Sequence, residues 1–192
     1  GLHGCHYHGY DQDYLRKVKA VYFGMVSMMD HSIGQILGHL EASGQADNTM
    51  VVFTTDHGHF IGEHGLSAKG PFLYEDMIRI PFIARWPGKI PAGARSDGIV
   101  SLVDLAPTFL SACGLPIPPV MSGKDQLAAW CGDASAFRDH AICEHHHDPT
   151  TVHLKTLVEQ RWKVTVYYNQ SYGELYDLEN DPEERVNLWI RP

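Results

Sequence analysis

Residues 49–71 read TMVVFTTDHGHFIGEHGLSAKGP, and this stretch decides the fold class. Its first part, residues 49–54, is a continuous run of apolar and β-branched side chains that is too short for a helix. Such a run predicts a buried parallel strand. The run ends at Asp56 and His57, and ligands of α/β sheets bind beyond the carboxyl ends of strands. The stretch therefore predicts an α/β fold with a site at this strand end.

A helical pattern precedes the strand. Between residues 13 and 43, apolar side chains recur at steps of three and four, and Gly44 supplies a natural stop. The methionines Met25, Met28 and Met29 belong to this pattern, and we expect them to fill the core. A helix that leads into a strand with a polar end is typical of α/β proteins.

The segments after the strand predict a loop, a strand and a helix. Residues 58–71 contain four glycines and predict a long functional loop. Residues 80–86 (IPFIARW) predict a second buried strand. A helix is expected from residue 101 to residue 112, with Asp104 as its N-cap.

The texture of the sequence changes towards the C-terminus. From residue 151 onwards, strand-like segments alternate with short turns, which predicts a small antiparallel sheet. We expect residues 1–120 to form the α/β core and residues 121–192 to form a small α+β subdomain.

Charge and composition exclude some classes of partner. The net charge of −8 argues against nucleic acid, because phosphate binding needs a basic face. No run approaches the ~20 apolar residues of a membrane span, so no membrane partner is expected. The first residues, GLHGCHYHGY, lack the apolar core of a signal peptide. The four cysteines show no paired zinc-type spacing, and we expect free thiols.

One group of residues carries the chemistry of a metal and oxyanion site. Asp56 and His57 can both reach one divalent metal, as carboxylate and imidazole ligands. Lys69, at the far end of the glycine loop, could add an ammonium group for a tetrahedral oxyanion. His64 could protonate a leaving group or bind an anionic substrate. The residues alone also allow a plain Asp-His-Gly turn and a solvated lysine.

A second cluster of histidines lies at residues 145–147, beside Glu144 and Asp148. It could bind a metal or line a substrate pocket from the smaller sheet. A solvated loop is the alternative.

The stretch TTDHGHFIGEHGLSAKGPFLYEDMIRIPFIARWPGKIPAG resembles the C-terminal signature of the sulfatase family, which belongs to the alkaline-phosphatase-like superfamily. The matching pieces are a strand that ends in Asp-His-Gly, then Ala-Lys-Gly at residues 68–70, then Arg-x-Pro and Trp-Pro-Gly. The late segment GELYDLENDPEERVNL resembles the closing segment of the family. The resemblance covers most of residues 14–110 and 154–189.

This resemblance implies a fold and a set of site residues. The fold would be the C-terminal part of an alkaline-phosphatase-like sandwich, with a small antiparallel C-terminal sheet. Asp56 and His57 would be two metal ligands, and Lys69 would contact the sulfate group. His64 lies in the glycine loop, with a catalytic or substrate-binding role. The metal implied is Ca²⁺, but an imidazole ligand is unusual for calcium and keeps Mn²⁺ as an alternative.

The activity implied is that of a metal-dependent sulfuric ester hydrolase. Its substrate would be a sulfated glycan or an aryl sulfate. Family sulfatases form their nucleophile, formylglycine, in a C/S-x-P-x-R motif, and none of the four cysteines here stands in one. We therefore expect the nucleophile in a missing N-terminal half and little or no turnover by this chain alone. Pairing with that half, or self-association, would cover the exposed sheet edge.

The resemblance also implies a compartment and leaves two alternatives for the function. By family habit, the protein would be periplasmic, lysosomal or secreted. It could instead be a phosphonate monoester hydrolase or phosphatase of the same superfamily, because the deciding nucleophile lies upstream. It could also be a non-catalytic sulfate-binding fragment.

Overall fold

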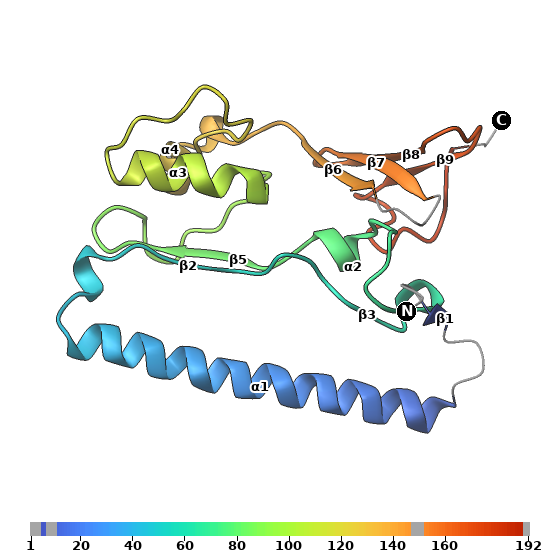
Figure 1. The fold of residues 1–192 in the computed structure, drawn as a ribbon, viewed down its shortest axis with the longest axis horizontal. Coiled ribbons are helices and arrows are strands. Elements are labelled where there is room, and N and C mark those ends of the chain that lie inside the picture. The colour runs from blue at the N-terminus through green and yellow to red at the C-terminus, as the bar shows by residue number, and fades with distance from the viewer. Residues whose placement is uncertain (1–4, 7–10, 147–151, 190–192) are drawn as a thin grey trace. The chain divides into compact units, whose positions relative to one another are not determined.

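The computed structural model describes residues 5–6, 11–146 and 152–189 (Figure 1). The chain divides into two compact units. The first comprises residues 1–72 and 76–89, and the second comprises residues 73–75 and 90–192. The expected division into an α/β core of residues 1–120 and a small α+β subdomain of residues 121–192 stays a prediction.

Helix α1 (Gln12–Ala42) confirms the long helical pattern. It begins at Asp11, whose carboxylate accepts a hydrogen bond from the backbone N–H of Tyr14 at 2.6 Å. This bond satisfies one of the donors that the first helical turn leaves unpaired. Beyond the helix, Gly44 adopts a left-handed conformation that glycine tolerates at a helix end.

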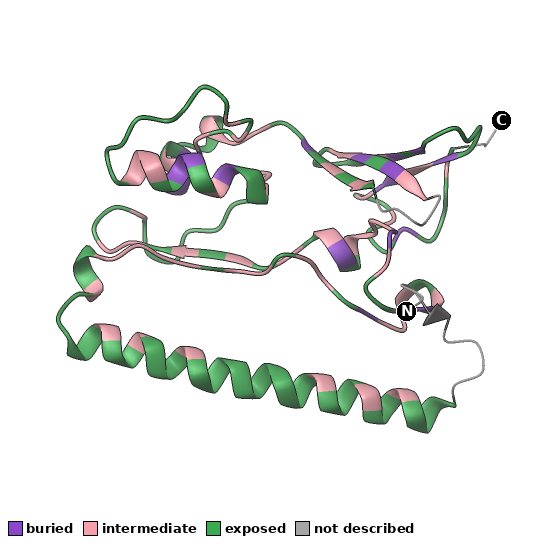
Figure 2. Cartoon of the chain, viewed as in Figure 1, coloured by how far each residue is buried: buried purple, intermediate pink, exposed green. Residues whose placement is uncertain are grey.

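The prediction that the methionines of α1 fill a core is wrong for the described chain. Met25, Met28 and Met29 are 50%, 66% and 54% exposed. No residue of α1 is buried, and Figure 2 shows the helix almost wholly exposed. The physical reason is that described residues cover its apolar face only in part.

Strands β2 (Val51–Thr54) and β5 (Phe82–Arg85) form where the apolar runs predict strands. They pair with each other and are antiparallel, so the expected parallel arrangement is wrong. They are not buried either: Phe53 and Ile83 face each other across the ladder, and Ile83 is 62% exposed. Each strand has only the other as its described sheet neighbour, so the outer edge of each strand has no described strand partner.

The glycine-rich segment is a hairpin rather than the loop we expected. β3 (Phe60–Ile61) and β4 (Leu66–Ala68) pair through the 3-10 turn η2 (Glu63–Gly65). β1 (Cys5–His6) joins the other edge of β4. Phe60 and Leu66 are buried, and their burial holds the hairpin together despite its polar neighbours.

The first unit also contains the 3-10 turn η1 (Ala46–Asn48) and residues 76–78 of helix α2 (Glu75–Ile78). The turn η1 joins α1 to β2. Helix α2 precedes β5, and its Met77 is buried.

The second unit begins with helices around a buried carboxylate. η3 (Leu102–Asp104) leads directly into α3 (Leu105–Ala112), and α4 (Leu127–Trp130) and η4 (Ala134–Ala136) follow. Asp104 stands at the N-cap position of α3, as expected, but makes no capping hydrogen bond there. Its side chain forms a capping box with Ser101 at η3 and pairs with Arg138 at 2.8 Å. A fully buried carboxylate needs such partners.

The expected antiparallel C-terminal sheet is confirmed. It consists of β6 (Ala141–His146), β7 (His153–Val158), β8 (Trp162–Tyr167) and β9 (Gly173–Asp177) in sequential order. All three neighbouring pairs are antiparallel.

The inner face of this sheet contains an ionic cluster. Lys163 is only 1% exposed, and its ammonium lies 2.6 Å from a carboxylate oxygen of Glu184 and 3.3 Å from one of Glu75. Glu184 also accepts a hydrogen bond from the backbone N–H of Glu75 at 2.6 Å. One buried cation therefore joins β8 to two segments distant in the sequence.

The described cysteines Cys113, Cys131 and Cys143 are free thiols, as expected, and the side chain of Cys5 lies outside the description. Among the described residues, no helix has the length and apolar character that crossing a membrane requires.

Candidate functional site

The site starts where β2 ends. Asp56 lies in the bend that follows the strand, and its side chain is 79% exposed. One carboxylate oxygen accepts hydrogen bonds from the backbone N–H of His57 at 3.0 Å and from the hydroxyl of Thr55 at 3.2 Å. The His57 N–H is the main cause that lowers the pKa of Asp56, and the imidazole and Thr55 add to it. The carboxylate is therefore ionised and accessible to a cation.

The ring of His57 is oriented by its own main chain. Its Nδ1 lies 2.7 Å from the carbonyl oxygen of Gly58. Because a carbonyl can only accept, a neutral ring carries its proton on Nδ1 and has its lone pair on Nε2. In metal-binding histidines, a hydrogen bond from the other ring nitrogen to a carbonyl fixes the tautomer in this way. Nε2 is thus the atom that can bind a metal.

The two donor atoms fit one divalent cation. His57 Nε2 and Asp56 Oδ2 are 3.6 Å apart. One ion can span this separation, because metal–ligand bonds are about 2.0 to 2.6 Å long. In the part of the chain that the structure describes, no group of three or more His, Cys, Asp or Glu side chains could hold a metal. Asp56 and His57 would therefore supply only part of a coordination shell.

The structure places His64 beside Asp76. It has a left-handed backbone, with φ 52° and ψ 20°, which costs a non-glycine residue about 1 to 3 kcal/mol. Its side chain is only 19% exposed, and Nε2 lies 3.7 Å from Oδ2 of Asp76. The structure therefore brings His64 to Asp76 and not to Asp56 or His57. Its predicted role as a catalytic or substrate-binding group stays a prediction.

Lys69 directly follows β4 and is exposed. The preceding residue, Ala68, also has a left-handed backbone, with φ 59°. No hydrogen bond or ion pair joins the ammonium of Lys69 to another described residue. The charge is therefore available to an anion.

The segment that supports the Asp-His turn was not predicted from the sequence. The N–H of Gly58 donates to the carbonyl oxygen of Met77 at 2.7 Å. A Cβ on Gly58 would lie 1.8 Å from the carbonyl oxygen of Asp76, so only glycine fits here. The glycine after Asp56-His57 was the available signal for such a close approach.

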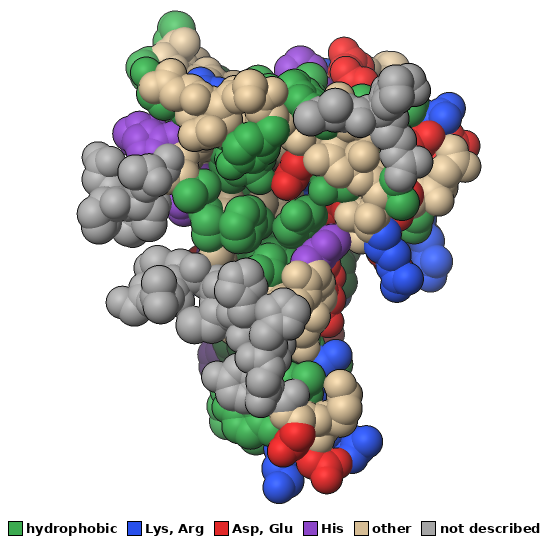
Figure 3. Space-filling view, turned by 90° about the vertical axis from the view of Figure 1, so that its right-hand side faces the viewer, with side chains coloured by type: hydrophobic (Ala, Val, Ile, Leu, Met, Phe, Trp, Pro, Cys, Tyr) green, Lys and Arg blue, Asp and Glu red, His purple; other side chains and the backbone are tan. Residues whose placement is uncertain are grey.

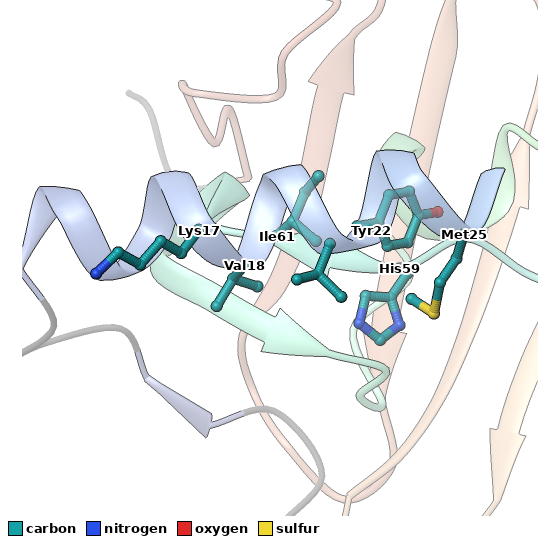
Figure 4. Close-up of a pocket in the computed structure, with 7 residues that line it drawn as sticks. Lys17, Val18, Tyr22, Met25, His59 and Ile61 are labelled. Carbon is teal, nitrogen blue, oxygen red and sulfur yellow. The ribbon is translucent and has the colours of Figure 1, made fainter. Parts of the chain in front are cut away.

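An apolar cavity of about 330 Å³ lies next to this region, between α1 and β3 (Figure 4). His59 forms part of its wall and stacks on Tyr22, with ring centroids 5.8 Å apart. Val18, Met25 and Ile61 supply apolar walls. These residues hold the start of the hairpin against the helix.

The histidine cluster of the second unit is described only in part. His146 and His153 are cross-strand partners, with ring centroids 3.8 Å apart. Glu144 forms an ion pair with Lys155 at 2.6 Å. The predicted members His147 and Asp148 lie outside the described residues, so the metal and pocket interpretations stay open.

The expectation that nucleic acid is not a partner stays a prediction. On the face shown in Figure 3, acidic side chains lie beside basic ones, and the described residues form no continuous basic patch there.

Two family profiles match the chain. The sulfatase profile matches residues 1–115, and the profile of the N-sulphoglucosamine sulphohydrolase C-terminal region matches residues 62–192. Together they span both units.

Individual proteins that resemble this chain include a sulfatase and a protein solved with a sulfated sugar. The N-acetylglucosamine-6-O-sulfatase of Bacteroides thetaiotaomicron is 35% identical over 193 residues, which cover 95% of this chain and 32% of the relative. Among solved structures, one protein in complex with its substrate, D-glucosamine-2-N,6-O-disulfate, is 34% identical to this chain. The two superpose with a TM-score of 0.79, and the match covers 85% of this chain and 34% of the solved chain.

A third similar protein is named for a different hydrolytic activity. The phosphonate monoester hydrolase of Silicibacter pomeroyi is 26% identical, with a TM-score of 0.77 over 87% of this chain and 36% of that chain. The chain spans about a third of the length of the curated relatives it matches. The structural neighbours confirm the alkaline-phosphatase-like fold class expected from the sequence. Because the sulfatase profile matches more than half of this chain, the chain belongs to the sulfatase family.

Proposed function

We propose that this chain forms part of an enzyme that hydrolyses sulfate esters with the help of a divalent cation. The observation that carries the proposal is the pair of open donor atoms on Asp56 and His57, 3.6 Å apart. Lys69 adds an exposed ammonium at the end of the adjacent hairpin. A cation and an ammonium together suit a tetrahedral oxyanion.

Each residue would have a distinct task. Asp56 and His57 would hold the cation, which supplies Lewis-acid stabilisation of the sulfate oxygens when bound. Lys69 would bind a sulfate oxygen and orient the sulfur for attack. His64 is a candidate for proton transfer to the leaving alcohol.

This chain does not supply the nucleophile that is typical of the family. By resemblance it is a formylglycine, and none of the four cysteines stands in a C/S-x-P-x-R motif. We propose that it comes from sequence outside these 192 residues, as do the remaining metal ligands. The isolated chain is then inactive, and pairing with that sequence, or self-association, would cover its open apolar faces.

The proposed substrate is a sulfated glycan. Two relatives support this choice, since one is named an N-acetylglucosamine-6-O-sulfatase and the other binds a disulfated glucosamine. An aryl sulfate fits the same cation and lysine. A periplasmic, lysosomal or secreted location belongs to the same proposal.

Calcium is the first candidate for the cation, because the family resemblance implies it and Asp56 is a hard oxygen ligand. The imidazole of His57 favours a more borderline ion such as Mn²⁺. Activity recovered by adding each ion to the metal-free enzyme would decide between them.

Phosphonate monoester hydrolysis is the second candidate function. It is supported by the structural similarity to the hydrolase of Silicibacter pomeroyi. A phosphonate monoester also carries an anionic tetrahedral centre, so the cation and Lys69 would suit it equally.

The test uses the protein expressed from its complete gene. Hydrolysis of an aryl sulfate, glucosamine 6-sulfate and a phenyl phosphonate ester is compared for the wild type, Asp56→Asn and Lys69→Ala. Removing one transition-state stabiliser should lower kcat/KM for the sulfate esters about 10²- to 10³-fold. Lys89→Ala, an exposed lysine of the same unit, is the control and should change little. Preference for the phosphonate, or full activity of both variants, would reject the proposal.

A further inference from the structure

The candidate site stands on two separate segments of the first unit. Asp56 and His57 lie in the turn after β2, whereas Lys69 follows the β3–β4 hairpin. Binding one sulfate group with both requires that the hairpin keep a fixed position relative to the turn. A displacement of about 1 Å can lower a catalysed rate about 10²-fold.

The turn is fixed against the backbone of α2. Gly58 donates its N–H to Met77, and there is no room for a Cβ between Gly58 and the carbonyl of Asp76. Met77 is buried, which anchors this part of α2 in the unit. The backbone of residues 76–77 is therefore the support on which the Asp-His turn rests.

The hairpin approaches the same residue through a side chain. Oδ2 of Asp76 lies 3.7 Å from Nε2 of His64 at the hairpin tip, a contact longer than a hydrogen bond that becomes an ion pair when the imidazole is protonated. His64 holds a left-handed backbone that a side chain disfavours, so the tip needs a contact that keeps it there. The strand pairing of β3 with β4 carries this position on to Ala68, the residue before Lys69.

We infer that Asp76 is a positioning residue that holds the Lys69 hairpin in place relative to the Asp56–His57 cation pair. Its carbonyl side faces the turn, and its carboxylate faces His64. In this arrangement His64 links the hairpin to α2, whatever part it takes in proton transfer. The inference rests on the proposed function for its catalytic consequence, but the mechanical link can be tested without it.

The experiment compares Asp76→Asn, Asp76→Ala and His64→Asn in the protein expressed from its complete gene. Asparagine at position 64 tolerates the left-handed backbone, so the variant removes the imidazole without adding strain. Asp47→Asn, an exposed aspartate of the same unit, is the matched control. The readouts are kcat and KM for an aryl sulfate, the cation concentration for half-maximal activity, the thermal midpoint and amide hydrogen exchange of residues 60–68.

We expect both Asp76 variants to lower kcat about 10- to 100-fold, as loss of a supporting contact around a metal site does. The half-maximal cation concentration should stay within about twofold, because Asp56 and His57 are intact. Hairpin amides should exchange faster in both variants. The Asp76→Asn/His64→Asn double variant should be no worse than either single variant, because both changes break one link.

Three outcomes would overturn the inference. Unchanged hairpin exchange in Asp76→Ala would show that the residue does not hold the hairpin. A parallel fall of kcat, cation affinity and thermal midpoint would show a general structural role instead. Additive losses in the double variant would show that the two side chains act separately. If the wild type hydrolyses no sulfate ester, the proposed function fails, and the exchange measurements alone decide whether Asp76 holds the hairpin.

Discussion

Helix α1 and the β6–β9 sheet both carry regular apolar patterns, yet only the sheet buries its apolar face. No residue of the 31-residue helix is buried. The sheet, in contrast, buries Leu154, Tyr167 and Tyr176 on its inner side. The pattern in the sequence is equally clear in both, so the pattern alone does not determine burial.

The difference lies in what the described chain places over each face. The second unit folds its closing segment over the sheet, and Glu184 of that segment reaches Lys163. In the first unit, the two-stranded β2–β5 ladder and α1 have no described layer of that kind. The candidate site lies in this first unit. Completing the site would therefore require further layers of chain, whereas the sheet is already covered by its own unit.

The largest expected effect comes from Lys163. Replacing it with alanine leaves the carboxylates of Glu184 and Glu75 without their cation in a buried place. Breaking a buried pair in this way costs about 3 to 5 kcal/mol. Urea unfolding followed by circular dichroism measures the loss. Lys155→Ala on the neighbouring strand, where the ion pair is exposed, should cost less than about 1 kcal/mol. Equal losses would contradict the role of burial.

A pair of apolar truncations compares the two regions directly. Leu154→Ala removes a buried side chain from β7 and should destabilise the protein by about 2 to 5 kcal/mol. Met28→Ala on the exposed face of α1 should change stability by no more than about 0.5 kcal/mol. The same urea experiment serves. A large loss from Met28→Ala would mean that its face is covered in solution.

Asp177 should give the sheet a stability that disappears in acid. Hydrogen bonds from Arg161, then Asn180, lower its pKa to about 2. A carboxylate with a depressed pKa in the folded state stabilises above its unfolded value of 3.8 and loses that contribution as pH falls towards 2. The thermal midpoint of the wild type should fall through this window, and Asp177→Asn should flatten the fall. An unchanged slope would contradict this account.

Tyr74 should produce a smaller effect at the alkaline end. Burial, reinforced by the charge of Glu174, raises its pKa to about 12. A folded pKa above the unfolded value of 10 stabilises below pH 10, and the contribution is lost as pH rises towards 12. Tyr74→Phe should therefore reduce the alkaline loss of stability. Tyrosinate absorbance followed through the same range should show one late-titrating group fewer in the variant.

Much of the fold could be predicted from local patterns. The long helix, the strand before Asp56 and the antiparallel C-terminal sheet all lie where periodicity and turns indicate them. The antiparallel pairing of β2 with β5 could not be predicted, because the choice of a strand partner depends on distant segments. The exposure of α1 could not be predicted either, because it depends on which layers cover it.

The candidate site shows the same limit. Asp56 and His57 are adjacent in the sequence, so their closeness follows from any compact turn. Asp76 gave no signal, because its role depends on contacts with Gly58 and His64, far away along the chain. Lys163 looked like an ordinary polar strand residue, since its two carboxylate partners lie in other segments.

The central claim is that Asp56, His57 and Lys69 act on one anion, and cation-dependent sulfate binding tests it most directly. Sulfate affinity is measured with and without Ca²⁺ or Mn²⁺ in the protein expressed from its complete gene. We predict that the cation tightens sulfate binding in the wild type and that Lys69→Ala weakens it about tenfold, equivalent to one lost charged contact. A sulfate affinity that changes neither with the cation nor in Lys69→Ala would contradict the claim.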